Sequence, residues 1–209
     1  MRSPPISTSI RARNVTFLTV LVALLTVQLT ACGKDSTFTQ QATTENVSRT
    51  ANVYALTGSA PELPAAYDMR TESYVRPLLQ FDGTVNFTLA FDINAQGKAV
   101  LLPVRQIVPL PPFPVGGSVS IGLAKSATPY DLLTYAANTG YTQDSTQIAS
   151  AGDTYMLKLL AAGCVYGEPV YGKLVIDSII VAERRIVVRT LTNRNCGGYR
   201  SLVAGLPKD

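Results

Sequence analysis

The chain of 209 residues contains no histidine, which excludes a Ser-His-Asp triad, a Cys-His dyad and any zinc site with a histidine ligand. Three arginines within the first 13 residues account for most of the formal net charge of +4. The remaining 15 basic and 14 acidic side chains nearly balance. This balance argues against a nucleic-acid partner, because nucleic-acid binding needs a dense cationic face.

The N-terminal segment has the pattern of a secretory leader. Arg2, Arg11 and Arg13 precede an uncharged apolar run over residues 15–31, and no acidic residue comes before the end of that run. A retained membrane helix would need about 20 apolar residues, and this run is slightly shorter. We therefore treat residues 1–31 as a signal peptide that is absent from the mature fold.

The end of the apolar run resembles the lipobox of bacterial lipoproteins. Leu29, Thr30 and Ala31 precede Cys32, which the resemblance identifies as the lipid acceptor. A thiolate is the nucleophile that can take up a diacylglyceryl group, and two or three acyl chains on one residue hold a protein firmly at a membrane. Gly33 stands where retained inner-membrane lipoproteins carry aspartate, so the resemblance implies the outer membrane where the organism has one.

A polar segment follows the cysteine. Residues 33–50 contain only Phe38 and Val47 as sizeable apolar side chains. Such a composition cannot bury enough surface to offset the entropy of ordering. We expect the lipidated cysteine and a disordered tether over residues 32–50, followed by a single domain over residues 51–209.

A period of two dominates this domain and predicts β-strands. In residues 84–93 it places Val85, Phe87, Leu89, Phe91 and Ile93 on a buried face and Asn86, Thr88 and Asp92 on the opposite face. An Asp-Gly pair at 82–83 predicts a tight turn. We expect further strands at residues 52–57, 74–80, 98–104, 118–125, 141–148, 154–160, 173–181 and 184–191, the last two forming a hairpin.

One segment departs from the strand pattern. Thr128 as N-cap, Pro129 at the first helical position and Gly140 as terminator predict a short helix. The whole pattern predicts an all-β fold, a single β-sandwich of about eight or nine mostly antiparallel strands with one short helix. The strand rhythm resembles immunoglobulin-like and transthyretin-like sandwiches of bacterial surface proteins, a resemblance that concerns the fold alone.

A calcium loop and paired carboxylates are the candidate metal and catalytic sites. Asp92, Asn94 and Gln96 before Gly97 imitate the opening of a calcium loop, but Pro103 stands where the bidentate glutamate should be. A hairpin turn with Gly97 in the left-handed conformation explains the same residues. We therefore expect neither a metal nor another cofactor.

Glycoside hydrolysis would need two carboxylates that face each other in space. The candidate pairs are Asp68 with Glu72 and Asp144 with Asp153. The chain contains no G-x-S-x-G, S-x-x-K or phosphate-loop motif. We therefore expect no catalytic residues and a protein that is not an enzyme, with a carboxylate-based hydrolase of envelope or surface polysaccharide as the alternative.

Two surface features could bind a partner. The C-terminal part is locally basic, with Arg184, Arg185, Arg189, Arg194 and Arg200. These arginines form either a solvated strand face that protects a sheet edge or a site for an anionic surface polymer or lipid headgroup.

The loop at residues 109–117 is rich in proline but also carries Leu110, Phe113 and Val115. It either folds over an open end of the sandwich or is exposed as a patch for a partner. We select these three apolar residues as the candidate partner-binding loop.

Cys164 and Cys196 are the thiols that remain once Cys32 is acylated. The leader directs the chain to a compartment that permits disulfides, and each cysteine follows a predicted strand. We expect a disulfide between them, with two buried, inert thiols as the alternative.

These features together predict a membrane-anchored, extracytoplasmic lipoprotein that works as a non-catalytic binding or structural module of the cell envelope. Its expected partners are the membrane, through Cys32, and another envelope protein or an anionic surface polymer. No nucleic acid is expected.

Overall fold

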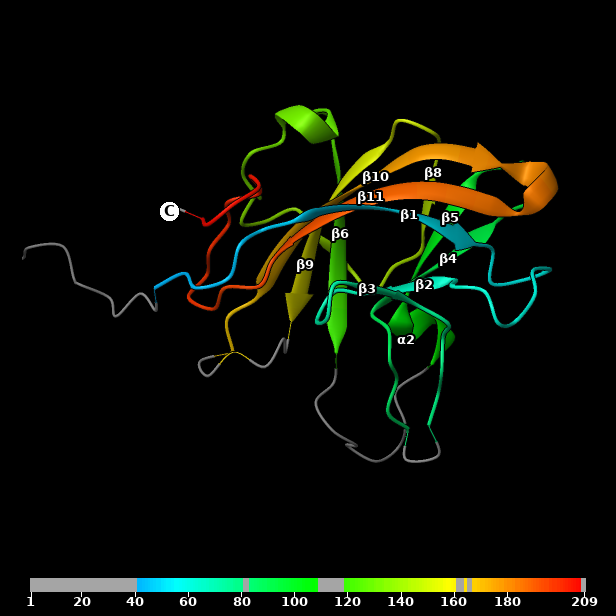
Figure 1. The fold of residues 1–209 in the computed structure, drawn as a ribbon, viewed down its shortest axis with the longest axis horizontal. Helices are drawn as coiled ribbons and strands as arrows, with labels where there is room; N and C mark the ends of the chain where they lie inside the picture. The colour runs from blue at the N-terminus through cyan, green and yellow to red at the C-terminus, as the bar shows by residue number, and fades with distance from the viewer. Residues whose placement is uncertain (1–40, 81–82, 109–118, 161–163, 165–166, 208–209) are drawn as a thin grey trace, which may run out of the picture. The chain divides into compact units, whose positions relative to one another are not determined.

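The computed structural model describes the chain in five ranges, and within them it forms two antiparallel sheets that pack as a β-sandwich (Figure 1). The ranges are residues 41–80, 83–108, 119–160, 164 and 167–207. The predicted lipid acceptor Cys32 and the apolar loop residues Leu110, Phe113 and Val115 lie outside the described residues. The all-β sandwich with one short α-helix agrees with the prediction.

The larger sheet contains six strands. They are β1 (Ser48–Tyr54), β6 (Ser120–Ser126), β7 (Thr142–Gln143), β9 (Thr154–Leu160), β10 (Val170–Ile180) and β11 (Arg185–Asn193). Their order is β1-β11-β10-β9-β6-β7, and all neighbours are antiparallel. The 3-10 turn η2 (Val181–Glu183) joins β10 to β11, which confirms the predicted hairpin.

The smaller sheet contains five strands. They are β2 (Ala66–Asp68), β3 (Ser73–Val75), β4 (Leu89–Ile93), β5 (Ala99–Pro103) and β8 (Gln147–Ala149), in the order β3-β2-β4-β5-β8. Gly97, with a φ of 73°, closes the β4–β5 hairpin. The Asn94 side chain accepts the N–H groups of Gln96 and Lys98 in this turn, so the hairpin interpretation of the calcium-like segment is confirmed.

The main core lies between the sheets. Large side chains from both sheets form one cluster there, including Tyr67, Leu89, Phe91, Leu101, Ile121, Leu157, Leu174 and Val188. A second cluster, which includes Tyr130, Tyr171 and Leu202, contains side chains of β10 and β11 that point away from the main core. The segment after β6 and the C-terminal segment cover this outer face of the six-stranded sheet.

Part of the outer face of the smaller sheet is also covered, which corrects the predicted face pattern at residues 87 and 88. Phe87 packs with Ala66, Ala90 and Val104, the last in α2 (Val104–Ile107), rather than with the main core. Thr88, predicted to be exposed, is fully buried. Where a strand is buried on both faces, the alternation of apolar and polar residues no longer identifies the side that faces the core.

The Thr88 hydroxyl both accepts and donates a hydrogen bond. Its Oγ1 accepts the N–H of Met69 and donates to the carbonyl of Tyr67. A buried hydroxyl is tolerated when its hydrogen bonds are made. Thr88 therefore links β4 to the end of β2 instead of facing water.

The predicted helix after Thr128 is only a 3-10 turn, η1 (Tyr130–Leu132), which begins after Pro129 without a side-chain cap. The buried Lys173 ammonium donates to the carbonyls of Tyr130 and Leu133, 2.9 Å away in each case. A side chain of β10 thus satisfies carbonyls that a longer helix would have bonded internally. The helices of the described ranges last a single turn, and none has the length and hydropathy of a membrane span.

The predicted tether boundary at residue 50 is also wrong. Asn46 is only 2% exposed and forms a bridge with Gly205, and β1 begins at Ser48. The Asn195 side chain accepts the N–H groups of Thr43 and Thr44. This segment is held in place by hydrogen bonds rather than by apolar burial, so its polar composition wrongly predicted disorder.

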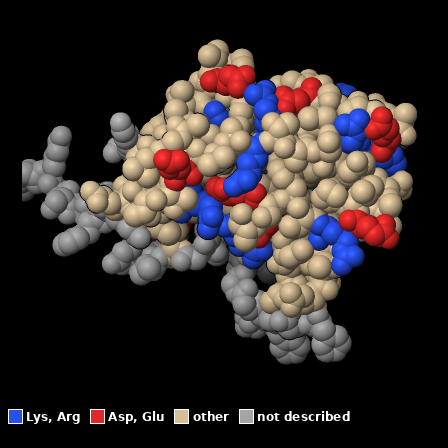
Figure 2. All heavy atoms as spheres, in the orientation of Figure 1, with Lys and Arg blue, Asp and Glu red and all other residues tan. Residues whose placement is uncertain are grey.

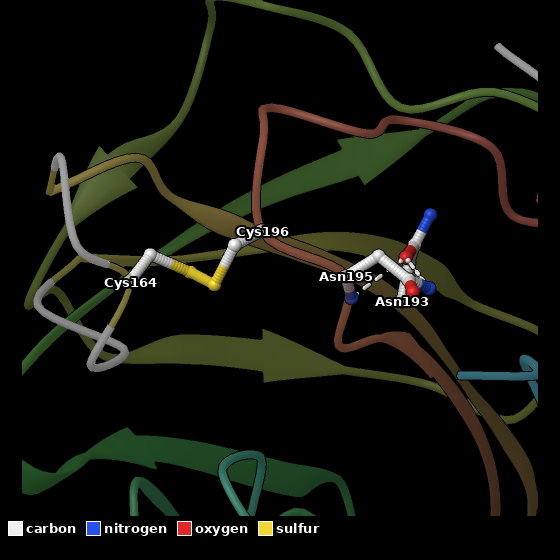
Figure 3. The surroundings of a disulfide bond; sticks show 4 residues. All are labelled: Cys164, Asn193, Asn195 and Cys196. Carbon is white, nitrogen blue, oxygen red and sulfur yellow. Dashed lines mark hydrogen bonds between the residues drawn. A yellow bond between two sulfur atoms is a disulfide. The ribbon is translucent and has the colours of Figure 1, made fainter. Parts of the chain in front are cut away.

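The predicted disulfide is confirmed. Cys164 and Cys196 are bonded, with their Cα atoms 5.5 Å apart (Figure 3). Strands β9 and β11 both flank β10, so their C-terminal ends lie at the same end of the sheet. The bond joins the segments that follow these two ends, next to the hydrogen-bonded side chains of Asn193 and Asn195.

We predict that Leu89→Ala lowers the free energy of unfolding by about 2–5 kcal/mol, because it removes fully buried volume from the main core. Thr88→Ala should cost about 1–3 kcal/mol, since it leaves the partners of the hydroxyl unpaired. Leu79→Ala, at a site 59% exposed, is the control and should change stability by less than about 0.5 kcal/mol. Urea unfolding measures all three. If Thr88→Ala lowers the free energy of unfolding no more than the control does, the two buried hydrogen bonds of the Thr88 hydroxyl are contradicted.

We also predict that neither Cys164 nor Cys196 reacts with iodoacetamide in the denatured, unreduced protein, and that both react after dithiothreitol treatment. Reduction should lower the free energy of unfolding by about 3–4 kcal/mol, given the sequence separation of 32 residues. Mass analysis of the cysteine-containing peptides counts the alkylated thiols. Alkylation of both before reduction would contradict the disulfide.

Candidate binding site

An open groove of about 520 Å³ lies between an edge strand of the larger sheet and an edge strand of the smaller one. Arg49 and Thr50 of β1 line one side, and Glu72, Ser73 and Tyr74 at the start of β3 line the other. Figure 1 shows β1 passing beside β2 and β3. The groove is therefore formed by edge strands that belong to two different sheets.

The turn before β3 positions Glu72. The Asp68 carboxylate accepts hydrogen bonds from the backbone N–H and side chain of Arg70 and from the hydroxyl of Thr71. These bonds order the turn between β2 and β3, where Glu72 has a φ of 55°. A non-glycine residue in this left-handed region costs about 1–3 kcal/mol, and such strain is concentrated at functional sites.

The Glu72 carboxylate is buried, with 7% of its side chain exposed, yet it is incompletely paired. One oxygen lies 3.5 Å from the guanidinium of Arg49, and the other has no hydrogen-bond partner. An unmatched buried polar atom costs about 1–3 kcal/mol. This oxygen is itself closed off from solvent, so a donor in the groove reaches it only if the turn before β3 shifts.

Arg49 complements that acceptor. Its side chain lines the groove and is 50% exposed, so it remains accessible to solvent. The site thus offers a buried acceptor beside an accessible, charged donor. A group that carries both a donor and an acceptor, such as a peptide amide, matches this arrangement.

The buried Tyr67 and the partly buried Tyr74 support the wall of the groove that belongs to the smaller sheet. The Tyr74 hydroxyl is hydrogen-bonded to Thr190, and the Tyr67 hydroxyl to Thr192, at 2.7 and 2.9 Å. Burial raises the pKa of Tyr67 to about 12, against the opposing effect of its threonine partner, and burial also raises the pKa of Tyr74. Both phenols therefore stay neutral and keep β2 and β3 joined to β11.

The proposed carboxylate pairs do not face each other in this groove. Asp68 is bonded within its own turn, and Glu72 is the acidic residue among those that line the groove. Asp144 is paired with Arg105 and Asp153 with Lys125. Burial opposes ionisation of Asp153, but hydrogen bonding to Lys125 leaves its pKa below the usual value.

The C-terminal arginines are largely ion-paired, which neither sequence interpretation had anticipated. Their partners are Asp92 for Arg184, Glu183 for Arg185, and both Asp131 and Asp177 for Arg189. Figure 2 shows basic and acidic side chains interspersed over one face of the molecule. Arg194 is exposed, and Arg200 stacks on the ring of Tyr135. The paired arginines weigh against an anionic polymer as the ligand.

The described residues contain no cluster of acidic, cysteine or histidine side chains suited to a metal ion. No protein-family model matches the chain, and neither a curated protein nor a solved structure matches it. The resemblance to immunoglobulin-like and transthyretin-like domains therefore stays a prediction. The groove is the candidate site that the described geometry supports.

We predict that Glu72→Gly raises the free energy of unfolding by about 1 kcal/mol. The change relieves the positive φ and removes an unpaired buried oxygen, which together outweigh the entropy that glycine adds to the unfolded chain. Urea unfolding followed by circular dichroism measures the effect.

Arg184→Gly is the matched control, because Arg184 also has a positive φ, of 48°. Its guanidinium donates to Thr57, Asp92 and Ile93, so its loss should destabilise by about 1–3 kcal/mol. Destabilisation of similar size by both changes would show that Glu72 is an ordinary structural residue.

Proposed function

We propose that this protein is a membrane-anchored, extracytoplasmic lipoprotein that works as a non-catalytic binding module of the cell envelope. The observation that carries the proposal is the Cys164–Cys196 disulfide. Disulfides form and persist in oxidising compartments, where the leader would send the chain. Since the chain has three cysteines, the disulfide leaves Cys32 as the remaining thiol, and Cys32 occupies the acceptor position of the lipobox.

The anchor places the sandwich at a membrane surface. Two or three acyl chains on Cys32 give firm attachment, whereas one chain holds only marginally. Gly33 after the acceptor favours the outer membrane in an organism that has two. The sandwich then faces the envelope space rather than the cytoplasm.

The groove between β1 and β3 is where the module binds, and an extended peptide segment of another envelope protein fits it best. Peptides commonly add to sheet edges, and β1 and β3 are both edge strands. A peptide amide offers a carbonyl to the exposed guanidinium of Arg49, and its N–H is the donor that the Glu72 carboxylate lacks once a shift of the turn admits it. The groove contains one carboxylate among the residues that line it, which favours binding over carboxylate-based hydrolysis.

We predict that cells fed a labelled fatty acid incorporate the label into this protein through Cys32. Cys32→Ser should reduce the label to background, because serine does not provide the thiolate nucleophile. The readout is label per amount of protein, from fluorography and immunoblotting of the same gel.

Cys164→Ser is the matched control, since it removes a cysteine of the disulfide and leaves the acceptor intact. It should keep its label even if less protein accumulates. Equal labelling of Cys32→Ser and the unchanged protein would refute the anchor.

A further inference from the structure

The N-terminal segment is attached to the folded body from residue 42 onward. The N–H of Ala42 donates to the hydroxyl of Tyr199, and those of Thr43 and Thr44 donate to Asn195 at 2.8 and 2.9 Å. Asn46 then exchanges two backbone hydrogen bonds with Gly205, each of 2.9 Å. The point at which the chain enters the sandwich is therefore defined to within a few residues.

Large apolar side chains surround this point. Val47, Tyr135, Val203 and Leu206 are 43–49% exposed, and we call them the N-terminal face. They lie along the C-terminal segment, because its residues form bridges with both neighbouring segments: Gly205 with Asn46, and Ser201 with Tyr135. Exposed apolar residues on neighbouring segments are a candidate for an interaction surface.

The rim of the face carries cationic groups. The Arg200 guanidinium lies 4.7 Å from the centroid of the Tyr135 ring, and Arg194 is exposed close to Asn195. Tyrosine is typical of the boundary between lipid and water, and basic side chains there are attracted to anionic headgroups. The composition is that of an interfacial surface.

We propose that the N-terminal face lies against the membrane that carries the lipid anchor, which sets the orientation of the sandwich. This inference rests on the proposed lipidation of Cys32. Cys32 and Ala42 are ten positions apart, a distance of at most about 35 Å when fully extended. A short connection of this kind gives an effective concentration on the order of millimolar, so contacts of low intrinsic affinity are populated.

The orientation has a consequence for the groove. Strands β10 and β11 run from the end of the sheet beside Asn193 to the η2 turn, and the 9 residues of β11 span about 30 Å. Contact through the N-terminal face directs the η2 end away from the bilayer. Arg49 and Thr50, near the start of β1, then lie within reach of proteins that project from the same membrane.

Tryptophan fluorescence tests the orientation without background, because the chain contains no tryptophan. Val203→Trp and Leu206→Trp place reporters on the N-terminal face, both at sites 49% exposed. Val181→Trp, at a site 51% exposed in η2, is the matched control. Each full-length variant is purified from cells fed labelled fatty acid and reconstituted in vesicles of phosphatidylethanolamine and phosphatidylglycerol containing lipids with brominated acyl chains.

We expect bromine to quench the reporters at 203 and 206 at least twofold more than the reporter at 181. Circular dichroism melting confirms that each variant keeps its fold. Two tryptophan reporters are used on the same face so that a local disturbance caused by one substitution does not decide the result. Labelled protein with equal quenching at all three positions would overturn the orientation while leaving the anchor intact. Protein without the label would refute the proposed function itself, and the orientation with it.

Discussion

The relation between the two sheets depends on hydrogen bonds that join them, among them the buried bond of Tyr67 to Thr192 and the partly buried bond of Tyr74 to Thr190. Apolar contacts stabilise the packing of the two sheets but do not fix their relative position, because the hydrophobic effect is not directional. A hydrogen bond adds a net stabilisation of only about 0.5–1.5 kcal/mol, but a buried hydroxyl without its partner costs about 1–3 kcal/mol. Together with the bonds from Arg184 to Asp92 and Ile93, these two bonds select one alignment of the smaller sheet against β11. That alignment places Glu72 beside Arg49 and so forms the groove.

Several strands were predictable where alternation and turn residues agreed. The bounds of β9 match the sequence prediction, and the β10–β11 hairpin was expected at its observed position. Two of the errors share one cause, a hydrogen-bond partner that is distant in sequence. Lys173 satisfies the carbonyls of the segment predicted to be helical, and Asn195 orders residues that appeared too polar to fold. The local sequence pattern of a segment does not reveal hydrogen-bond partners that lie elsewhere in the chain.

The candidate site illustrates the same limit. The disulfide could be predicted because composition and compartment left two thiols with one natural pairing. The groove could not, because β1 and β3 belong to different sheets and nothing in the sequence around Glu72 signals a left-handed backbone. Glycine is the usual residue in that conformation. The basic appearance of the C-terminal hairpin was likewise offset by acidic partners on other segments, such as Asp92 and Asp131.

Photo-crosslinking in the native membrane tests the central claim, that the groove between β1 and β3 binds another envelope protein. A benzophenone amino acid at Thr50, exposed on β1, should form one major protein adduct that is lost when Glu72→Gln is added. The same probe at Ile148, exposed on β8 at the far edge of the smaller sheet, should form none. Identical adducts from both positions, or an adduct at position 50 that persists with Glu72→Gln, would contradict the account.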